Sequence, residues 1–195
     1  MSEGEISIDD PRAKDVLELL EHHLAFANLH TPPEDVHALD VDGLLDPAVM
    51  FFSFHLKGEL LGVGALKQLD GSHAELKSMH TAQVARGQGI GRAMVDHLIG
   101  VARDRGFHRV SLETGSMPAF APARSLYANA GFRPCRPFGD YRPSRNSTFM
   151  TLSFERSRLR GLTRPTVRPA RESSATRVGP EWKFALGGNG DARQF

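Results

Sequence analysis

Hydrophobic side chains recur at helical spacing in several stretches of the chain. The clearest stripe begins after residue 89, and its apolar positions are Ile90, Met94, Val95, Leu98, Ile99 and Ala102. We expect Gly106 to end this helix. A second helix is predicted over residues 11–27, with Pro11 in its first turn. A shorter helix opens at Thr31-Pro32-Pro33 with Thr31 as its cap, and a last one covers residues 120–130.

Short apolar or alternating runs between these helices predict strands, at residues Glu5–Ile8, Val49–Leu56, 60–66, 74–81, 108–112, 132–136 and 148–154. Lys57-Gly58-Glu59 forms a tight turn between the second and third strands. The order of elements is helices, an antiparallel meander, and then strand–helix–strand–helix–strand. This order predicts a mixed α/β domain with one crossover connection.

Composition narrows the class of protein. Apolar residues make up 40% of the 195 residues, which is enough for a chain of this length to bury a core. The single cysteine, Cys135, excludes an internal disulfide framework and a multi-thiolate metal site, and we expect no metal. No run approaches the ~18 apolar residues of a membrane span. The start of the chain is polar and acidic, unlike a secretory signal, so we expect a cytoplasmic protein.

Charge divides the chain into two unequal parts. Residues 155–195 hold eight Arg and one Lys against four acidic residues, a net +5, whereas the whole chain is +1 and residues 1–154 are therefore −4. We expect residues 1–154 to form the domain and residues 155–195 to be a disordered basic tail. The alternative is a contact arm for RNA, an acidic partner or a second subunit. The balanced total excludes a chain that binds nucleic acid electrostatically as a whole.

The most informative segment, between a strand and a helix, reads Arg86-Gly87-Gln88-Gly89-Ile90-Gly91-Arg92. Glycines allow a sharp backbone turn, and the first turn of a helix offers unpaired N–H donors and the positive end of its dipole. Flanking arginines add charge-assisted hydrogen bonds. The segment therefore predicts an anion site suited to a pyrophosphate. A tight loop without a ligand is the alternative.

Two common phosphate-binding motifs do not fit this spacing. The dinucleotide fingerprint G-x-G-x-x-G would place Arg92 or Met94 where its third glycine is required, and the P-loop requires a lysine after the glycines. The arrangement Arg86-x-x-Gly89-x-Gly91 instead resembles the pyrophosphate signature Q/R-x-x-G-x-G/A of the GNAT superfamily of acetyl-CoA-dependent N-acetyltransferases.

The resemblance covers roughly residues 5–154. Residues 75–81 resemble the fourth strand of that family, and residues 123–132 resemble its A-x-x-L-Y-x-x-x-G-F motif. Residues 111–117, 137–141 and 146–150 are similar to a bacterial branch often labelled indoleacetic-acid acetyltransferases. The resemblance implies an α/β fold of GNAT type: a mixed, mostly antiparallel central sheet with flanking helices and a splayed strand pair.

The family's site residues can be carried over position by position. Acetyl-CoA would lie between the fourth and fifth strands, with backbone groups of Met79 and Thr81 pairing with it, and Tyr127 would protonate the leaving thiolate. The alternative for Tyr127 is a core position. The residues that would bind the pyrophosphate are Arg86, Gly87, Gln88, Gly89, Ile90, Gly91 and Arg92.

One departure from the family is Phe120. Many relatives have an asparagine there that contacts the coenzyme. The resemblance therefore implies that this hydrogen bond is absent, or is replaced by Ser116 or Ser125.

Two glutamates are candidates for the base that deprotonates the attacking amine, directly or through water. Strict alternation would place Glu75, Lys77, Met79 and Thr81 on one face of their strand and Leu76, Ser78 and His80 on the other. Some family members have a glutamate base at the position of Glu75. A salt bridge to Lys77 is the alternative for Glu75. Glu113, near the end of the fifth strand, is the second candidate, with capping of the following loop as its alternative.

The expected function is transfer of an acetyl group to a primary amine of a small molecule or peptide. Direct attack in a ternary complex is expected because Cys135 is not placed like a covalent nucleophile. The alternatives are a CoA-binding sensor without turnover and an RNA-associated acetylator guided by the tail. A homodimer is also expected from the family.

The acceptor's charge stays open at this point. The net −4 of residues 1–154 favours a cationic amine, with Asp140, Tyr141 and Arg142 among the polar candidates for contact. An acidic acceptor would be held instead by Arg133, Arg142 and Arg145.

Overall fold

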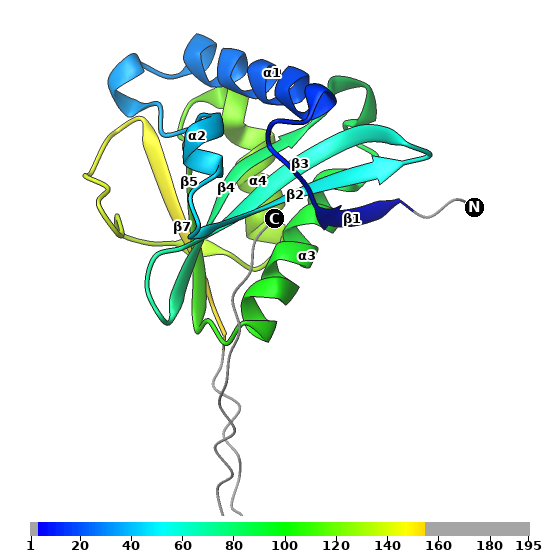
Figure 1. The fold of residues 1–195 in the computed structure, drawn as a ribbon. Helices are drawn as coiled ribbons and strands as arrows, with labels where there is room; N and C mark the ends of the chain where they lie inside the picture. The colour runs from blue at the N-terminus through cyan, green and yellow to red at the C-terminus, as the bar shows by residue number, and fades with distance from the viewer. Residues whose placement is uncertain (1–3, 155–195) are drawn as a thin grey trace, which may run out of the picture. The chain divides into compact units, whose positions relative to one another are not determined.

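A twisted sheet of seven strands is the framework of residues 4–154, the part of the chain that the computed structural model describes (Figure 1). The strands lie in the order β1-β2-β3-β4-β5-β7-β6. Only the β4–β5 pair is parallel among the described strands. The strands are β1 (Glu5–Ile8), β2 (Val49–Leu56), β3 (Glu59–Gln68), β4 (His73–Thr81), β5 (Arg109–Gly115), β6 (Arg133–Pro134) and β7 (Ser147–Ser153). The predicted mixed, mostly antiparallel sheet is thus confirmed.

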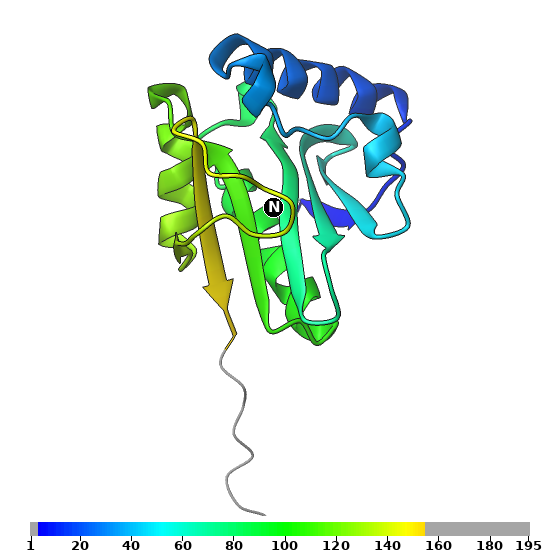
Figure 2. The ribbon, with the colours of Figure 1, turned by 90° about the vertical axis from the view of Figure 1, so that its left-hand side faces the viewer.

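Helices cover both faces of the sheet (Figure 2), and the buried apolar side chains form three clusters. The helices are α1 (Lys14–His30), α2 (Val41–Leu44), α3 (Ile90–Asp104) and α4 (Ala121–Asn129), and single 3₁₀ turns are η1 (Pro33–Asp35), η2 (Gln83–Ala85) and η3 (Pro118–Phe120). The larger core includes side chains of α3 such as Leu98, together with Leu66 and Leu112 of the sheet. A second core joins Val16 and Leu20 of α1 to the opposite face, and a small third one holds Leu61, Ala85 and Ile90.

The parallel strands β4 and β5 separate part of the way along their length. They pair from His73↔Arg109 to Leu76↔Leu112 and not beyond, although β4 continues to Thr81 and β5 to Gly115. The diverging end of β5 stays paired with β7 through Gly115↔Ser147. The diverging end of β4 stays paired with β3 through Thr81↔Gly62. The expected splayed strand pair is therefore confirmed, and Lys77 and Glu113 are the first residues past the separation.

A bulge in β4 corrects the prediction of strict alternation. The register with β3 shifts between Val63 and Ala65, and Ser78 has a left-handed backbone with φ of 50°. Because a bulge adds one residue to one strand, the faces exchange after it. Met79 packs with the α3 core, as Leu76 does, whereas His80 lies beside His23 of α1. Met79 and Glu75 are therefore not on one face, and His80 is not opposite Glu75.

The predicted element boundaries also need correction. Helix α1 begins at Lys14, after Pro11, and its last turn is closed by the N–H of Thr31, which donates to the carbonyl of Ala27. Thr31 as an N-terminal cap was wrong, because η1 follows Pro32 and has no side-chain cap. Two prolines in succession remove the N–H groups that a cap would satisfy. The expectations for residues 155–195 lie outside the described residues.

None of the helices described between residues 4 and 154 combines the length and the apolar character needed to cross a lipid bilayer.

Candidate functional site

A cavity of about 570 Å³ opens where β4 and β5 separate. Its lining is drawn from both diverging strand ends, the glycine loop and first turn of α3, the segment from η3 through α4, the buried face of α1, and the segment of residues 31–38. Residues far apart in the sequence therefore meet around one space.

The glycine loop presents unpaired backbone donors to one end of this cavity. Gly87 and Gly89 have positive φ angles of 77° and 85°, which favour glycine. Gly89 is the N-terminal cap residue of α3, and no side chain caps the helix. The first hydrogen bond of the helix runs from Ala93 N–H to the Gly89 carbonyl, which leaves the N–H groups of the first turn free of intrahelical partners. This end of the cavity is suited to an anion.

The polar side chains around the loop are only partly available. Arg92 donates to Asp96 at 2.8 Å and to the Asn129 carbonyl at 3.2 Å. Gln88 turns its side chain to the Val84 carbonyl at 3.0 Å and does not line the cavity. Arg86 lines it and makes one long hydrogen bond, 3.4 Å, to the Thr81 carbonyl. Of the two arginines in the predicted anion site, Arg86 is the less committed to other protein groups.

Met79 and Thr81 lie on the stretch of β4 that has lost its β5 partner. Alternate backbone groups of this stretch face the cavity instead of a strand. The Met79 side chain packs toward α3, and a Cβ placed on Gly64 would lie 2.7 Å from the Met79 sulfur. Gly64 thus provides the close approach that the bulged strand requires.

Tyr127 reaches the cavity from α4. Its side chain is buried, contacts the Phe132 ring and lines the cavity. Burial raises the pKa of the phenol well above its usual value of 10.0, and the nearby carboxylate of Glu113 raises the pKa further. Tyr127 therefore stays protonated at neutral pH and close to Glu113.

Glu75 lies in a buried network and outside the lining of the cavity. The Tyr141 hydroxyl donates to Glu75 Oε1 at 2.6 Å, and the Lys77 ammonium is 3.6 Å from the same oxygen. Lys77 also donates to Tyr141 Oη at 2.8 Å and to the His37 carbonyl at 2.7 Å. The side chains of Glu75 and Lys77 are 4% and 10% exposed. The predicted salt bridge between them is present, and Tyr141 joins it.

Glu113 does line the cavity. It is the first residue of β5 beyond the last β4–β5 pair. Burial raises the pKa of its carboxyl above the usual 4.5, and the Lys77 ammonium partly offsets that effect. Of the two predicted base candidates, Glu113 is the one in contact with the reaction space.

Two histidines of the cavity were not predicted as site residues. His23 and His80 lie edge to face, with ring centroids 5.3 Å apart, and both line the cavity. Burial lowers the pKa of each to about 4, so both rings are neutral at pH 7. The spacing of His23 from Leu19 and Ala27, four residues on either side, could have placed it on the buried face of α1.

Phe120 and the two serines do not replace the hydrogen bond expected from an asparagine. Phe120 lies against Phe26 of α1, with ring centroids 5.2 Å apart. The Ser116 hydroxyl donates to the Arg145 carbonyl, and neither Ser116 nor Ser125 lines the cavity. At this position the chain makes an aromatic contact with α1.

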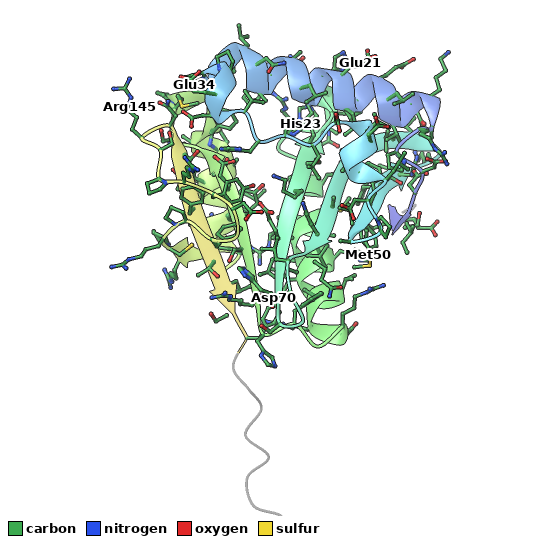
Figure 3. All side chains as sticks on the ribbon, turned by 60° about the vertical axis from the view of Figure 1, so that its left-hand side comes forward. Glu21, His23, Glu34, Met50, Asp70 and Arg145 are labelled. Atoms are coloured by element: carbon green, nitrogen blue, oxygen red, sulfur yellow. The ribbon has the colours of Figure 1, made fainter. Side chains whose placement is uncertain are left out.

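The polar candidates of the 137–147 loop are placed differently from one another. Tyr141 is half-buried and joins the network with Glu75, whereas Asp140 and Arg142 are exposed and do not line the cavity. Arg133 and Arg145 are also exposed and outside the lining, and Figure 3 shows Arg145 extending away from the molecule.

Cys135, the single cysteine of the chain, lies among the described residues. Cys135 does not line the cavity, and burial raises the pKa of its thiol. No group of three or more His, Cys, Asp or Glu side chains in this part of the chain could hold a metal ion.

Comparison with known proteins extends these observations. The model of the Acetyltransferase (GNAT) family matches residues 14–132. The chain is 45% identical over 146 residues to a Bacillus subtilis protein named Uncharacterized N-acetyltransferase YsnE, covering 75% of this chain and 97% of that protein.

Solved structures share the fold. A Klebsiella pneumoniae protein assigned to the acyl-CoA N-acyltransferases has a TM-score of 0.64 at 24% identity, covering 77% of this chain and 97% of its own. A GNAT family acetyltransferase from Elizabethkingia anophelis, solved with acetyl-CoA bound, has a TM-score of 0.57 at 18% identity, covering 77% and 98%.

Tyr141→Phe tests the buried network. The substitution removes a donor to a buried carboxylate, which costs about 1–3 kcal/mol of the free energy of unfolding. Tyr127→Phe is the matched control, because no hydrogen bond joins the Tyr127 hydroxyl to another residue in 4–154 and its loss should change stability little. Urea unfolding of both variants measures the difference. Equal midpoints for the two variants would contradict the assignment of Tyr141 as the stabilising partner of Glu75.

Proposed function

Because this chain belongs to the Acetyltransferase (GNAT) family of acyltransferases, we propose that it moves an acetyl group from acetyl-CoA to a primary amine. Transfer occurs by direct attack with both substrates bound together. The observation that carries the proposal is the uncapped N-terminus of α3, which opens onto the cavity between the splayed strands β4 and β5.

The residues present fit acetyl-CoA. Gly87, Gly89 and the first turn of α3 supply backbone N–H donors for the two phosphoryl groups, and Arg86 adds a positive charge. Ile90, Gly91 and Arg92 contribute through the backbone of this turn. Gln88 supports the shape of the loop, since its backbone N–H donates to the Ala85 carbonyl at 3.4 Å and its side chain to the Val84 carbonyl. The unpaired backbone of Met79 and Thr81 supplies donors for the pantetheine arm and the thioester oxygen.

Acetyl-CoA supplies the acetyl thioester, and the chain's own residues manage the protons. The amine nitrogen forms a bond to the carbonyl carbon as the carbon–sulfur bond breaks. Glu113 accepts the proton that the amine loses, directly or through a water. Tyr127 gives its proton to the departing sulfur and regains one from the Glu113 side or from solvent, which balances the transfer.

Glu113 is favoured over Glu75 as the base by position. Glu113 borders the cavity and lies close to Tyr127, whereas Glu75 is enclosed by Tyr141 and Lys77. Glu75 then acts as a positioning residue that holds Lys77 and, through Lys77, the His37 segment of the wall.

Gly89→Asp tests coenzyme binding. A carboxylate beside the free N–H groups of α3 competes with and repels the diphosphate, so the affinity for acetyl-CoA should fall at least about 10-fold, equivalent to ~1.4 kcal/mol. Isothermal titration calorimetry measures the affinity of each variant for acetyl-CoA. Gly106→Asp is the matched control, because Gly106 has a similar φ of 80° and does not line the cavity. If acetyl-CoA gives no heat of binding with the unaltered protein, the proposal is wrong. If acetyl-CoA binds but no amine causes release of its thiol, the protein is a sensor.

Glu113→Gln tests the base. We expect kcat for thiol release to fall about 10²–10⁴-fold, whereas Glu75→Gln should have the smaller effect. The base must be deprotonated to act, and its pKa is raised. In the unaltered protein, kcat plotted against pH should therefore rise with pH through an acid limb that lies above pH 4.5. The limb should disappear in Glu113→Gln. A larger loss and a lost limb in Glu75→Gln would assign the base to Glu75 instead.

Tyr127→Phe tests the acid. The ring stays in its packed position without a transferable proton, so kcat should fall about 10²-fold with little change in the affinity for acetyl-CoA. Steady-state thiol release and calorimetry on the same preparation separate the two quantities. An unchanged kcat would show that the thiolate leaves without a proton from Tyr127.

A further inference from the structure

We propose that the acceptor is a cationic amine attached to an apolar, ring-sized body that carries no carboxylate. This inference rests on the proposed function and concerns the end of the same cavity away from the glycine loop. That end is lined by His23 and Phe26 of α1, by residues 35–38, by Lys77 and Glu113, and by Phe120.

Two of the charged side chains at this end are carboxylates. Asp35 lines the cavity and is held by Asn146, whose Nδ2 donates to its Oδ2 at 2.8 Å. That hydrogen bond lowers the pKa of Asp35, so it stays ionised at neutral pH. Glu113 is the second carboxylate. Both attract a cation and repel an acidic acceptor.

The positive charge of Lys77 does not cancel the negative charge that these two carboxylates present to a ligand. The Lys77 ammonium donates to the His37 carbonyl at 2.7 Å and to the Tyr141 hydroxyl at 2.8 Å, and the Glu75 carboxylate lies 3.6 Å away as its ion-pair partner. Its charge is thereby compensated inside the wall by Glu75. The buried histidines His23 and His80 add no positive charge at neutral pH.

The arginines that could have held an acidic acceptor are elsewhere. Arg133, Arg142 and Arg145 are exposed, and none of them lines the cavity. Arg86 and Arg92 do line the cavity, beside the glycine loop, where Arg86 donates to the Thr81 carbonyl and Arg92 donates to Asp96. The charge of the acceptor, which the sequence left open, is therefore resolved in favour of a cation.

Aromatic edges form the apolar part of the wall. The Phe26 ring meets Phe120 at 5.2 Å and His30 at 4.7 Å between centroids, in T-shaped geometry. Phe120 also lies over the backbone of β5, where a Cβ on Gly115 would come within 2.4 Å of its ring. The Phe26 and Phe120 rings line the cavity, from α1 and η3 respectively. They can therefore make edge and face contacts with a flat apolar group. A linear polyamine would leave them uncovered.

A panel of matched acceptors tests the inference, with thiol release from acetyl-CoA as the readout. 2-Phenylethylamine is compared with phenylalanine, which adds a carboxylate, with spermidine, which lacks a ring, and with indole-3-acetate, which lacks the amine. We expect kcat/KM for 2-phenylethylamine to exceed that for each of the others at least 10-fold. A preference for phenylalanine, spermidine or indole-3-acetate overturns the inference and leaves acetyl transfer standing. If neither these compounds nor any other amine is acetylated, the proposed function is removed and the inference with it.

Two variants locate the recognition. Asp35→Asn should raise KM for 2-phenylethylamine about 10-fold with kcat and the affinity for acetyl-CoA nearly unchanged, and Asp140→Asn, outside the cavity, should change neither constant. Phe26→Leu keeps an apolar side chain without a ring, and should reduce the preference for 2-phenylethylamine over spermidine. Equal KM values in Asp35→Asn and Asp140→Asn, or an unchanged preference in Phe26→Leu, would overturn the corresponding part of the inference.

Discussion

The separation of two parallel strands after the pair Leu76↔Leu112 is the constraint on which the site depends. Strand backbone is stable when its N–H and C=O groups are paired, so each strand that leaves a ladder must be supported in another way. Here β4 keeps β3 and β5 keeps β7 on their outer sides. Their inner sides are left for another molecule to satisfy, which is how a sheet creates a polar-edged cavity without unfolding.

The bulge at Ser78 determines which side chains of β4 face the cavity. Without the extra residue, Met79 would face α1 and His80 would face α3. With it, the flexible Met79 side chain fills the α3 core against Gly64, and the neutral His80 ring joins His23 of α1 at the cavity. One residue in a left-handed conformation thus directs the apolar Met79 to the core under α3 and the polar His80 to the face covered by α1.

The fold was predictable because its signals are local. The stripe of α3, the glycines before it and the apolar runs of the strands each require only a few neighbouring residues to be recognised. The arrangement of Glu75 depends on Tyr141, which is 66 residues away and reaches it through a loop of irregular structure. Neither periodicity nor spacing encodes such a contact. The bulge was missed for a related reason: Ser78 is not a glycine, and its conformation is imposed by the pairing with β3.

The wall around the proposed acceptor end is assembled from two chain segments that hold each other. Residues 35–38 are fastened to the strand by Lys77, whose ammonium also engages Tyr141, and to the later loop by the Asp35–Asn146 contact across 111 positions of sequence. Substitutions in groups that share partners are not additive. A change of acceptor preference on this scaffold would therefore require coordinated replacement of both segments. A chimaera that exchanged only one of them would lose the contacts that join the two segments.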